Sequence, residues 1–149
     1  MRILVTGGAG YIGSNLVDTL IDGGHEIFVI DNLSTGRIAN IEHLLGHERF
    51  HFVNDTILNE SLMDRIVAQV DQVYHLAAVV GVKYVVEDPL HGIYTNVKGT
   101  EVVLETAYKY WRRVVIASSS EVYGKSTAVP LDEGADRLLG PTTVARWSY

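Results

Sequence analysis

Five short apolar segments recur along the chain, with longer mixed stretches between them. They span Arg2–Thr6, Glu26–Asp31, Phe50–Asn54, Gln72–Ala77 and Val114–Ser118. Polar residues interrupt them rarely, as is typical of strands buried on both faces of a parallel sheet. The pattern therefore predicts five parallel strands.

The stretches between the strands have helical spacing. Apolar stripes cover Ile12–Ile21 and Leu62–Val70, and Ile38–Leu45 is predicted to be a short helix. A third stripe follows Asp88-Pro89, an acid suited to cap a helix and a proline suited to its first turn. Its members are Leu90, Ile93, Val97, Leu104, Ala107 and Trp111. Strands that alternate with helices predict an α/β fold, a Rossmann-like doubly wound parallel sheet with strand order 3-2-1-4-5.

The segment from Lys125 to Arg146 has no clear periodicity and contains two prolines and two glycines. We predict a long loop over the carboxyl ends of the strands, where ligands of such sheets bind.

Composition narrows the class of protein. The 149 residues are 47% hydrophobic, so one globular domain over residues 1–149 is expected. There is no apolar run of membrane-spanning length, and no signal-peptide pattern. The chain has no cysteine, which excludes disulfides and thiolate metal ligands and fits a cytoplasmic protein. A net charge of −6 argues against a nucleic-acid surface.

Candidate chemistry begins directly after the first predicted strand. Residues Val5 to Gly13 read V-T-G-G-A-G-Y-I-G and lead into a helical stripe, while Asp31 ends the next predicted strand. Glycines let backbone amides approach a pyrophosphate, and the helix dipole favours that anion. Strand, glycine turn, helix, strand and acid together predict a dinucleotide site.

The acid at the end of the second strand indicates which dinucleotide is bound. A carboxylate there can accept hydrogen bonds from ribose hydroxyls and repels a 2′-phosphate, so Asp31 favours NAD over NADP. Arg37 lies nearby in sequence and keeps NADP open as an alternative.

Six motifs in chain order carry a resemblance to a known family. They are Thr6–Gly13, Asp31–Gly36, Asp55, His75–Ala78, Asn96–Thr100 and Ser118–Gly124. With them, the chain resembles the extended short-chain dehydrogenases/reductases, in their NAD-dependent epimerase/dehydratase branch, from residue 1 to residue 149. The resemblance implies that cofactor-binding residues are Gly7, Gly10, Tyr11, Ile12, Gly13, Asp31, Asn32, Ser34, Thr35, Gly36, Asp55, Thr56, Leu76, Ala77, Ala78 and Asn96.

The same resemblance implies a reaction. NAD would take hydride from C4 of a nucleotide-linked sugar, most often a UDP-sugar, while Tyr149 takes the hydroxyl proton and Ser119 bonds to the reacting oxygen. Glu121 stands where dehydratases and decarboxylases of the family carry a glutamate that handles a proton at C5. The resemblance leaves 4-epimerase, 4,6-dehydratase and uronate decarboxylase open.

The family's Tyr-x-x-x-Lys motif would place its lysine four residues beyond Tyr149, where the sequence stops. We therefore expect an N-terminal portion that lacks the sugar-binding lobe and binds NAD with little or no turnover. Self-association is expected, as a homodimer through the Leu90–Trp111 helix. A non-catalytic NAD-binding module and a reductase of a non-sugar ketone are the alternatives.

Three histidines are spaced by four residues, at His43, His47 and His51. A helix could present them to a metal ion, but Gly46 and the strand at Phe50 interrupt it. We expect no metal site and interpret them as solvated side chains.

Overall fold

The computed structural model describes residues 1–81 and 87–144, which belong to two compact units divided after Ile116. Each unit is described by itself. Within these ranges, no helix is long and apolar enough to cross a membrane.

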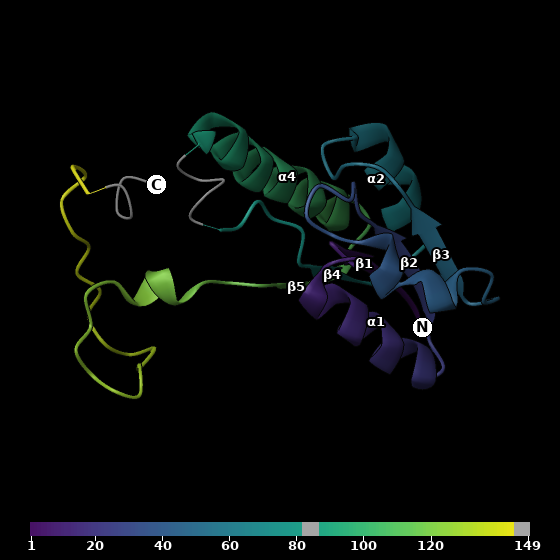
Figure 1. Cartoon of the computed structure of the whole chain (residues 1–149), viewed down its shortest axis with the longest axis horizontal. Coiled ribbons are helices and arrows are strands. Elements are labelled where there is room, and N and C mark those ends of the chain that lie inside the picture. The colour runs from purple at the N-terminus through teal and green to yellow at the C-terminus, as the bar shows by residue number, and fades with distance from the viewer. Residues whose placement is uncertain (82–86, 145–149) are drawn as a thin grey trace. The chain divides into compact units, whose positions relative to one another are not determined.

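The first unit is built on a parallel sheet of five strands, β1 (Arg2–Thr6), β2 (Glu26–Ile30), β3 (Phe50–Val53), β4 (Gln72–His75) and β5 (Arg113–Ile116). Their order is β3-β2-β1-β4-β5 (Figure 1), which confirms the predicted order. In the register, Thr6 of β1 lies beside Ile30 of β2 and His75 of β4. The carboxyl ends of these three strands therefore meet at one edge of the sheet.

Helices cover both faces of this sheet. Helix α1 (Tyr11–Asp22) lies on one face, and α2 (Glu60–Val67) and α4 (Pro89–Lys109) lie on the other (Figure 1). Asp88 caps α4 by accepting a hydrogen bond from the His91 amide, with Pro89 in the first turn, as the sequence predicts. One core cluster joins α2 and α4 to the sheet, and the second joins α1 to the opposite face.

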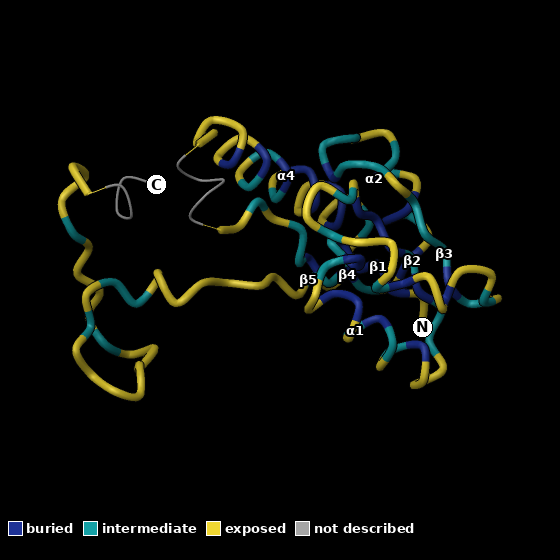
Figure 2. The backbone as a smooth tube through the Cα atoms, viewed as in Figure 1, coloured by how far each residue is buried: buried dark blue, intermediate teal, exposed yellow. Residues whose placement is uncertain are grey.

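The central strands are the most buried part of the unit (Figure 2). Leu4 and Val5 of β1 are fully buried, and they contribute to opposite core clusters. Burial on both faces explains why this strand reads as an unbroken apolar run. The strand assignments are confirmed, although four of the five predicted strands extend one or two residues beyond the observed carboxyl end.

The predicted helix over Ile38–Leu45 is wrong in detail. The chain forms two single 3₁₀ turns, η1 (Ile38–Asn40) and η2 (Glu42–Leu44), separated by Ile41. Ile41 has a φ of −128° and a ψ of 1°, which lie outside helical geometry and interrupt the helix at its centre. Its side chain is fully buried in the core cluster beside α1.

The face of helix α4 that packs against the sheet is not the face that carries its large apolar side chains. Of the predicted apolar stripe, Ala107 is buried, whereas Leu90, Val97 and Trp111 are 77%, 65% and 85% exposed. The face turned toward the sheet consists mainly of small residues, namely Gly92, Thr95, Gly99, Val102, Val103, Thr106 and Ala107. The predicted helix is confirmed, and most of its large side chains face away from the core of this unit.

The second unit begins with η3 (Ser120–Tyr123). Its segment 125–144 contains turns but no helix or strand, as predicted for a loop. Gly124 has a φ of +62°, and a Cβ there would lie 2.6 Å from the Leu138 carbonyl oxygen. The Lys125 amide donates to that same oxygen at 2.8 Å, so these segments pack closely within the unit.

Candidate functional site

The glycine turn after β1 is compact because its glycines are packed against backbone. Gly7 has a φ of +73°, and a Cβ on it would lie 2.8 Å from the Ala77 nitrogen. A Cβ on Gly13 would overlap the Gly7 carbonyl oxygen. By contrast, Gly10 has only that oxygen near it, at 3.2 Å. Gly7 and Gly13 are therefore required by the fold of the turn itself.

Helix α1 begins at this turn with its first amides uncommitted to side chains. Gly10 is the N-cap and supplies no side-chain acceptor, and the first helical turn contains no acidic residue. The amides of Tyr11, Ile12 and Gly13 belong to that first turn, where a helix has no carbonyl partner for them. Such a helix start favours an anion by hydrogen bonding and by its dipole.

Asp31 lies directly after β2 and is nine-tenths buried. One carboxylate oxygen accepts the Ala9 amide at 3.0 Å, and the other accepts the Leu33 amide at 2.8 Å. Leu33 has a left-handed φ of +58°, which is unfavourable for a branched side chain. The carboxylate thus holds the glycine turn and the turn after β2 together. Because each oxygen can accept a second hydrogen bond, ribose hydroxyls can still bind to it.

The turn after Asp31 lies beside this carboxylate. Asn32, Ser34 and Thr35 are exposed, and the Asn32 side chain accepts the Ser34 amide at 3.1 Å. A Cβ on Gly36 would lie 2.8 Å from both Asp31 carboxylate oxygens. This predicted adenosine loop therefore packs against the acid that it accompanies in sequence.

Asp55 and Thr56 follow β3 and are half-buried. The Asp55 carboxylate accepts the Thr56 amide at 2.7 Å and the Asn59 side-chain amide at 2.9 Å. Asn59 in turn caps α2. These bonds fix the turn between β3 and α2 at the same edge of the sheet.

The turn after β4 is tied to β1 by the hydroxyl of Thr6 and by its carbonyl oxygen, which accepts the Leu76 amide at 3.2 Å. The buried Thr6 Oγ1 accepts the amides of Leu76 at 3.2 Å and Ala77 at 3.1 Å. It also lies 2.7 Å from His75 Nδ1, while His75 Nε2 lies 3.1 Å from Thr100 Oγ1 on α4. Burial lowers the pKa of His75 from its ordinary value. The Ala78 residue that follows is exposed.

Asn96 of α4 holds the next part of this turn. Its side chain accepts the Val79 amide at 2.7 Å and donates to the Val79 carbonyl at 3.0 Å. The residue was predicted to bind the cofactor. In the structure it fixes the backbone of Val79, which follows Leu76 and Ala77, the two residues that pack against Gly7.

The predicted catalytic residues belong to the second unit. Ser119 caps η3 by accepting the Glu121 amide at 3.3 Å, and both side chains are exposed. Tyr149 lies outside the described residues. Ser119 belongs to the second unit, whereas the glycine turn belongs to the first.

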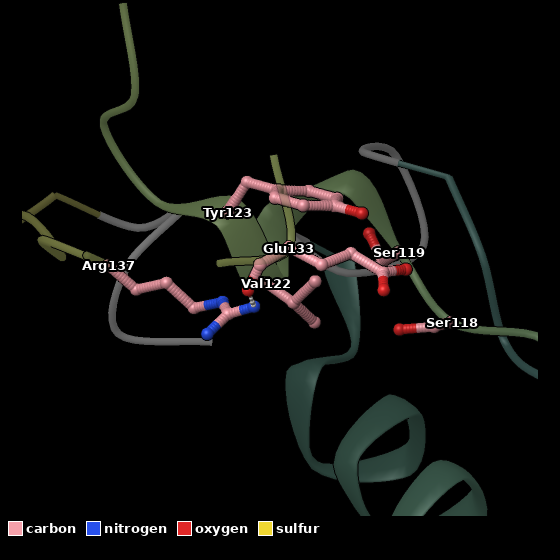
Figure 3. A pocket seen from close by; sticks show the side chains of 6 residues that line it. All are labelled: Ser118, Ser119, Val122, Tyr123, Glu133 and Arg137. Atoms are coloured by element: carbon pink, nitrogen blue, oxygen red, sulfur yellow. Dashed lines mark hydrogen bonds between the residues drawn. The ribbon is translucent and has the colours of Figure 1, made fainter. Parts of the chain in front are cut away.

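A pocket of about 430 Å³, open to solvent, lies within the second unit. Its lining residues are Ser118, Ser119, Val122, Tyr123, Glu133 and Arg137. Figure 3 shows the Glu133 side chain extending toward Ser119, with Arg137 at the other end. The Arg137 guanidinium donates to the Glu133 carbonyl at 2.7 Å. The pocket therefore combines hydroxyl, carboxylate and guanidinium groups in one small volume.

Sequence reasoning missed several residues that build the site. The Asn40 side chain donates to the Ala9 carbonyl at 2.8 Å, although its sequence position gives no signal of this. Glu133 and Arg137 also lie in a segment without periodicity. Thr6 and His75 fall inside recognisable motifs, but only the structure brings their side chains together.

The three spaced histidines have separate partners in the structure. His43 bonds to Asp18 at 2.9 Å, and His51 bonds to Glu26 at 2.9 Å. His47 accepts the Arg49 amide at 3.2 Å. Among residues 1–81 and 87–144, no three potential metal ligands gather in one place.

Comparisons with known proteins agree with this architecture. A family model described as GDP-mannose 4,6 dehydratase matches residues 4–142. A UDP-N-acetyl-alpha-D-glucosaminuronate decarboxylase from Bacillus cytotoxicus is 43% identical over 148 residues, which are 99% of this chain and 45% of that protein.

Two solved structures are similar in fold and sequence. A UDP-N-acetylglucosamine 4-epimerase from Methanobrevibacter ruminantium superposes with a TM-score of 0.85 at 31% identity, over 99% of this chain and 47% of that one. A dTDP-glucose 4,6-dehydratase from Streptomyces venezuelae, crystallised with NAD, gives 0.80 at 34% identity, over 89% and 45%. This chain spans less than half the length of each of these three proteins.

Proposed function

Because the chain belongs to the GDP-mannose 4,6 dehydratase family of the extended short-chain dehydrogenases/reductases, we propose that it binds NAD as the cofactor-binding part of a nucleotide-sugar-modifying enzyme. The enzyme would act through a 4-keto sugar. The observation that carries the proposal is the glycine turn with uncommitted α1 amides, bridged by Asp31 to the turn after β2.

The residues of the first unit fit NAD. The first amides of α1 would bind the pyrophosphate, since no acidic side chain of that turn competes for them. Asp31 would bind the adenosine ribose through its remaining lone pairs, and its charge disfavours the 2′-phosphate of NADP. The Asn32–Gly36 turn and Asp55-Thr56 would flank the adenosine. Bound NAD supplies the hydride acceptor for sugar oxidation.

The second unit would supply the groups that handle protons. Ser119 would donate a hydrogen bond to the sugar oxygen that becomes the ketone, and Tyr149 would take its hydroxyl proton. In uronate decarboxylation the C6 carboxylate is β to the C4 ketone, so the C5–C6 bond breaks, CO₂ leaves and its electrons form a C4–C5 enolate. Glu121 would return a proton to C5 of that enolate. We propose a UDP-sugar as substrate. Uronate decarboxylation is the favoured reaction, since the named Bacillus cytotoxicus relative is a decarboxylase of a UDP-linked uronate.

Calorimetric titration of the 149-residue chain with NAD and with NADP tests the cofactor proposal. We expect saturable binding of one NAD per chain and weaker binding of NADP. Gly13→Ala should lose NAD affinity, because the added methyl overlaps the Gly7 carbonyl, whereas Gly23→Ala, where a Cβ meets nothing closer than 3.4 Å, is the matched control that should keep it. Absence of NAD binding by the folded wild-type chain would refute the proposal.

We further propose that the protein acts in the cytoplasm as a homodimer and that the exposed apolar face of α4 is the interface. Val97 on this face is 65% exposed, and Leu45, after η2 and outside α4, is 49% exposed. Sedimentation velocity should show a concentration-dependent dimer that Val97→Asp weakens and Leu45→Asp leaves intact. Equal effects of the two substitutions would contradict an interface on α4.

A further inference from the structure

His75 lies where three elements meet, below the glycine turn. It is the last residue of β4, its Nδ1 faces the last residue of β1, and its Nε2 faces α4. The side chain is 4% exposed, and the hydroxyls of Thr6 and Thr100 are its two hydrogen-bond partners. None of the roles proposed above uses this imidazole.

Counting donors and acceptors fixes the direction of each hydrogen bond. A threonine hydroxyl has one proton and two lone pairs. The backbone amides of Leu76 and Ala77 can only donate, and both donate to Thr6 Oγ1, although the Leu76 amide lies equally close, at 3.2 Å, to the Thr6 carbonyl oxygen. With its lone pairs facing these amides, the hydroxyl directs its proton to His75 Nδ1, which accepts it. The ring then carries its own proton on Nε2 and donates to Thr100.

The two amides held by Thr6 lie against the glycine turn. A Cβ on Gly7 would lie 2.8 Å from the Ala77 nitrogen and 2.9 Å from its Cα. No atom larger than hydrogen fits between these backbones. Any movement of the Leu76–Ala77 turn would therefore displace the backbone of the glycine turn at Gly7.

We propose that His75 is a positioning residue for the cofactor site: in its neutral, Nε2-protonated form it takes the Thr6 hydroxyl proton, so that both Thr6 lone pairs hold the Leu76–Ala77 turn against Gly7. The inference rests on the proposed NAD binding for its functional readout. A protonated ring would instead direct an N–H at Thr6. One lone pair of Thr6 Oγ1 would then go to the ring, so the hydroxyl could no longer accept fully from both amides, and the Leu76 amide would keep only the Thr6 carbonyl oxygen at 3.2 Å.

The groups around the ring favour the neutral form. Burial is the cause of the lowered pKa of His75. On α4, Lys98 beside Thr100 is paired with Glu60 and Glu101. On the two neighbouring strands, the charged residues are at the opposite, amino-terminal ends, at Arg2 of β1 and Arg113 of β5. Protonation of His75 would thus place an unpaired charge between two hydroxyls.

The ¹⁵N spectrum of the imidazole tests the hydrogen-bond directions in the unaltered 149-residue chain. At neutral pH we expect the His75 ring to carry its proton on Nε2 and to have a bare, hydrogen-bonded Nδ1. A proton on Nδ1 would overturn the proposal, because the ring would then donate to Thr6 Oγ1 instead of accepting its proton. Because this measurement uses the unaltered chain, its result does not depend on whether a variant folds.

Two variants separate positioning from packing. In His75→Asn, the side-chain oxygen can replace Nδ1 as acceptor, whereas His75→Phe keeps a ring without an acceptor. We expect NAD affinity within about threefold of wild type for Asn and a loss of about tenfold for Phe, the size of one lost hydrogen bond. The exposed His43→Asn serves as control. Equal NAD affinity of the Asn and Phe variants would overturn the role of His75.

The pH profile provides an independent readout. Because burial lowers the pKa of His75, the neutral ring persists at pH 6.5, and wild-type affinity for NAD should fall only at pH values below this ordinary histidine pKa of about 6.5. The Asn variant, which cannot titrate there, should lack this component. Identical profiles would overturn the proposal. If wild type does not bind NAD at all, the proposed function fails instead, and the ring tautomer still decides the hydrogen-bond directions.

Discussion

Replacing Asp31 by Asn tests the cofactor site most directly, because it removes the charge and keeps the size of the side chain. The wild-type carboxylate accepts one amide on each oxygen, from Ala9 and from Leu33. The Asn side chain has a single acceptor oxygen, so its NH₂ group would face the second amide. One charge-assisted hydrogen bond is lost, and one buried donor is left without an acceptor.

The expected cost follows from these two bonds. A hydrogen bond to a charged group contributes about 1.5–3 kcal/mol, so Asp31→Asn should lower the free energy of unfolding by roughly 2–4 kcal/mol once the orphaned donor is included. This is a large part of the 5–15 kcal/mol, roughly, that stabilises a typical domain. Asp31→Ala is a poorer test, because it leaves both amides without the carboxylate.

Binding should change in opposite directions for the two dinucleotides. Loss of the charge weakens the bond to the ribose hydroxyls by about 1–2 kcal/mol, or about 5- to 30-fold in NAD affinity. The same loss removes the repulsion of a 2′-phosphate, so the affinity for NADP should rise relative to that for NAD.

Denaturant unfolding and calorimetric titration with both dinucleotides measure these effects, below the temperature at which the variant unfolds. Asp18→Asn is the matched control, because Asp18 is an exposed acid on α1 that pairs with His43. It should change stability by less than about 1 kcal/mol and leave both affinities unaltered. An unchanged ratio of NAD to NADP affinity in Asp31→Asn would refute the role given to Asp31.

Three further predictions concern the supports of the site. Gly13→Ala should unfold at a lower temperature than Gly23→Ala in calorimetry, because a Cβ at Gly23 meets nothing closer than 3.4 Å; equal melting temperatures would contradict the packing argument. Asn96→Asp should weaken NAD binding by about tenfold, the size of one lost hydrogen bond, since a carboxylate cannot donate to the carbonyl that Asn96 now holds; titration that finds wild-type affinity would exclude this support role. A hydrogen bond from Lys109 lowers the pKa of Asp64, so this pair stabilises the fold above pH 4, approximately, and its contribution is lost as pH falls further. Asp64→Asn should flatten that part of the acid-unfolding curve, and an unchanged curve would disprove the contribution.

The fold could be predicted because strands buried on both faces leave a strong sequence signal. Leu4 and Val5 face opposite core clusters, so the whole of β1 is apolar. The ends of the strands were less certain, because apolar residues continue beyond the hydrogen-bonded ladder. Leu76 and Ala77 extend the β4 run in sequence, yet the Leu76 amide is shared between the carbonyl and the hydroxyl of Thr6, and the Ala77 amide bonds to the hydroxyl.

The candidate site was predictable where backbone geometry demands one residue type. Gly7 and Gly13 leave a motif because no side chain fits at either position. The partners of those glycines leave no such motif. Asn40 reaches the Ala9 carbonyl from more than thirty residues away, and any donor of similar length at that position could do the same. Such contacts depend on how segments pack, which local spacing does not encode.

Helix α4 shows why an apolar stripe does not identify the buried face. Both faces of this helix are apolar, so periodicity alone favours the one with larger side chains. The sheet and α2 select the other face, because small residues let the backbones approach closely. A Cβ on Gly99 would overlap the Ile57 side chain. Large side chains of α4 such as Leu90 and Val97 are therefore left outside the core, where water contact is unfavourable. A cluster of this kind on one helix is expected to pack against another surface, and the interface proposed above places it there.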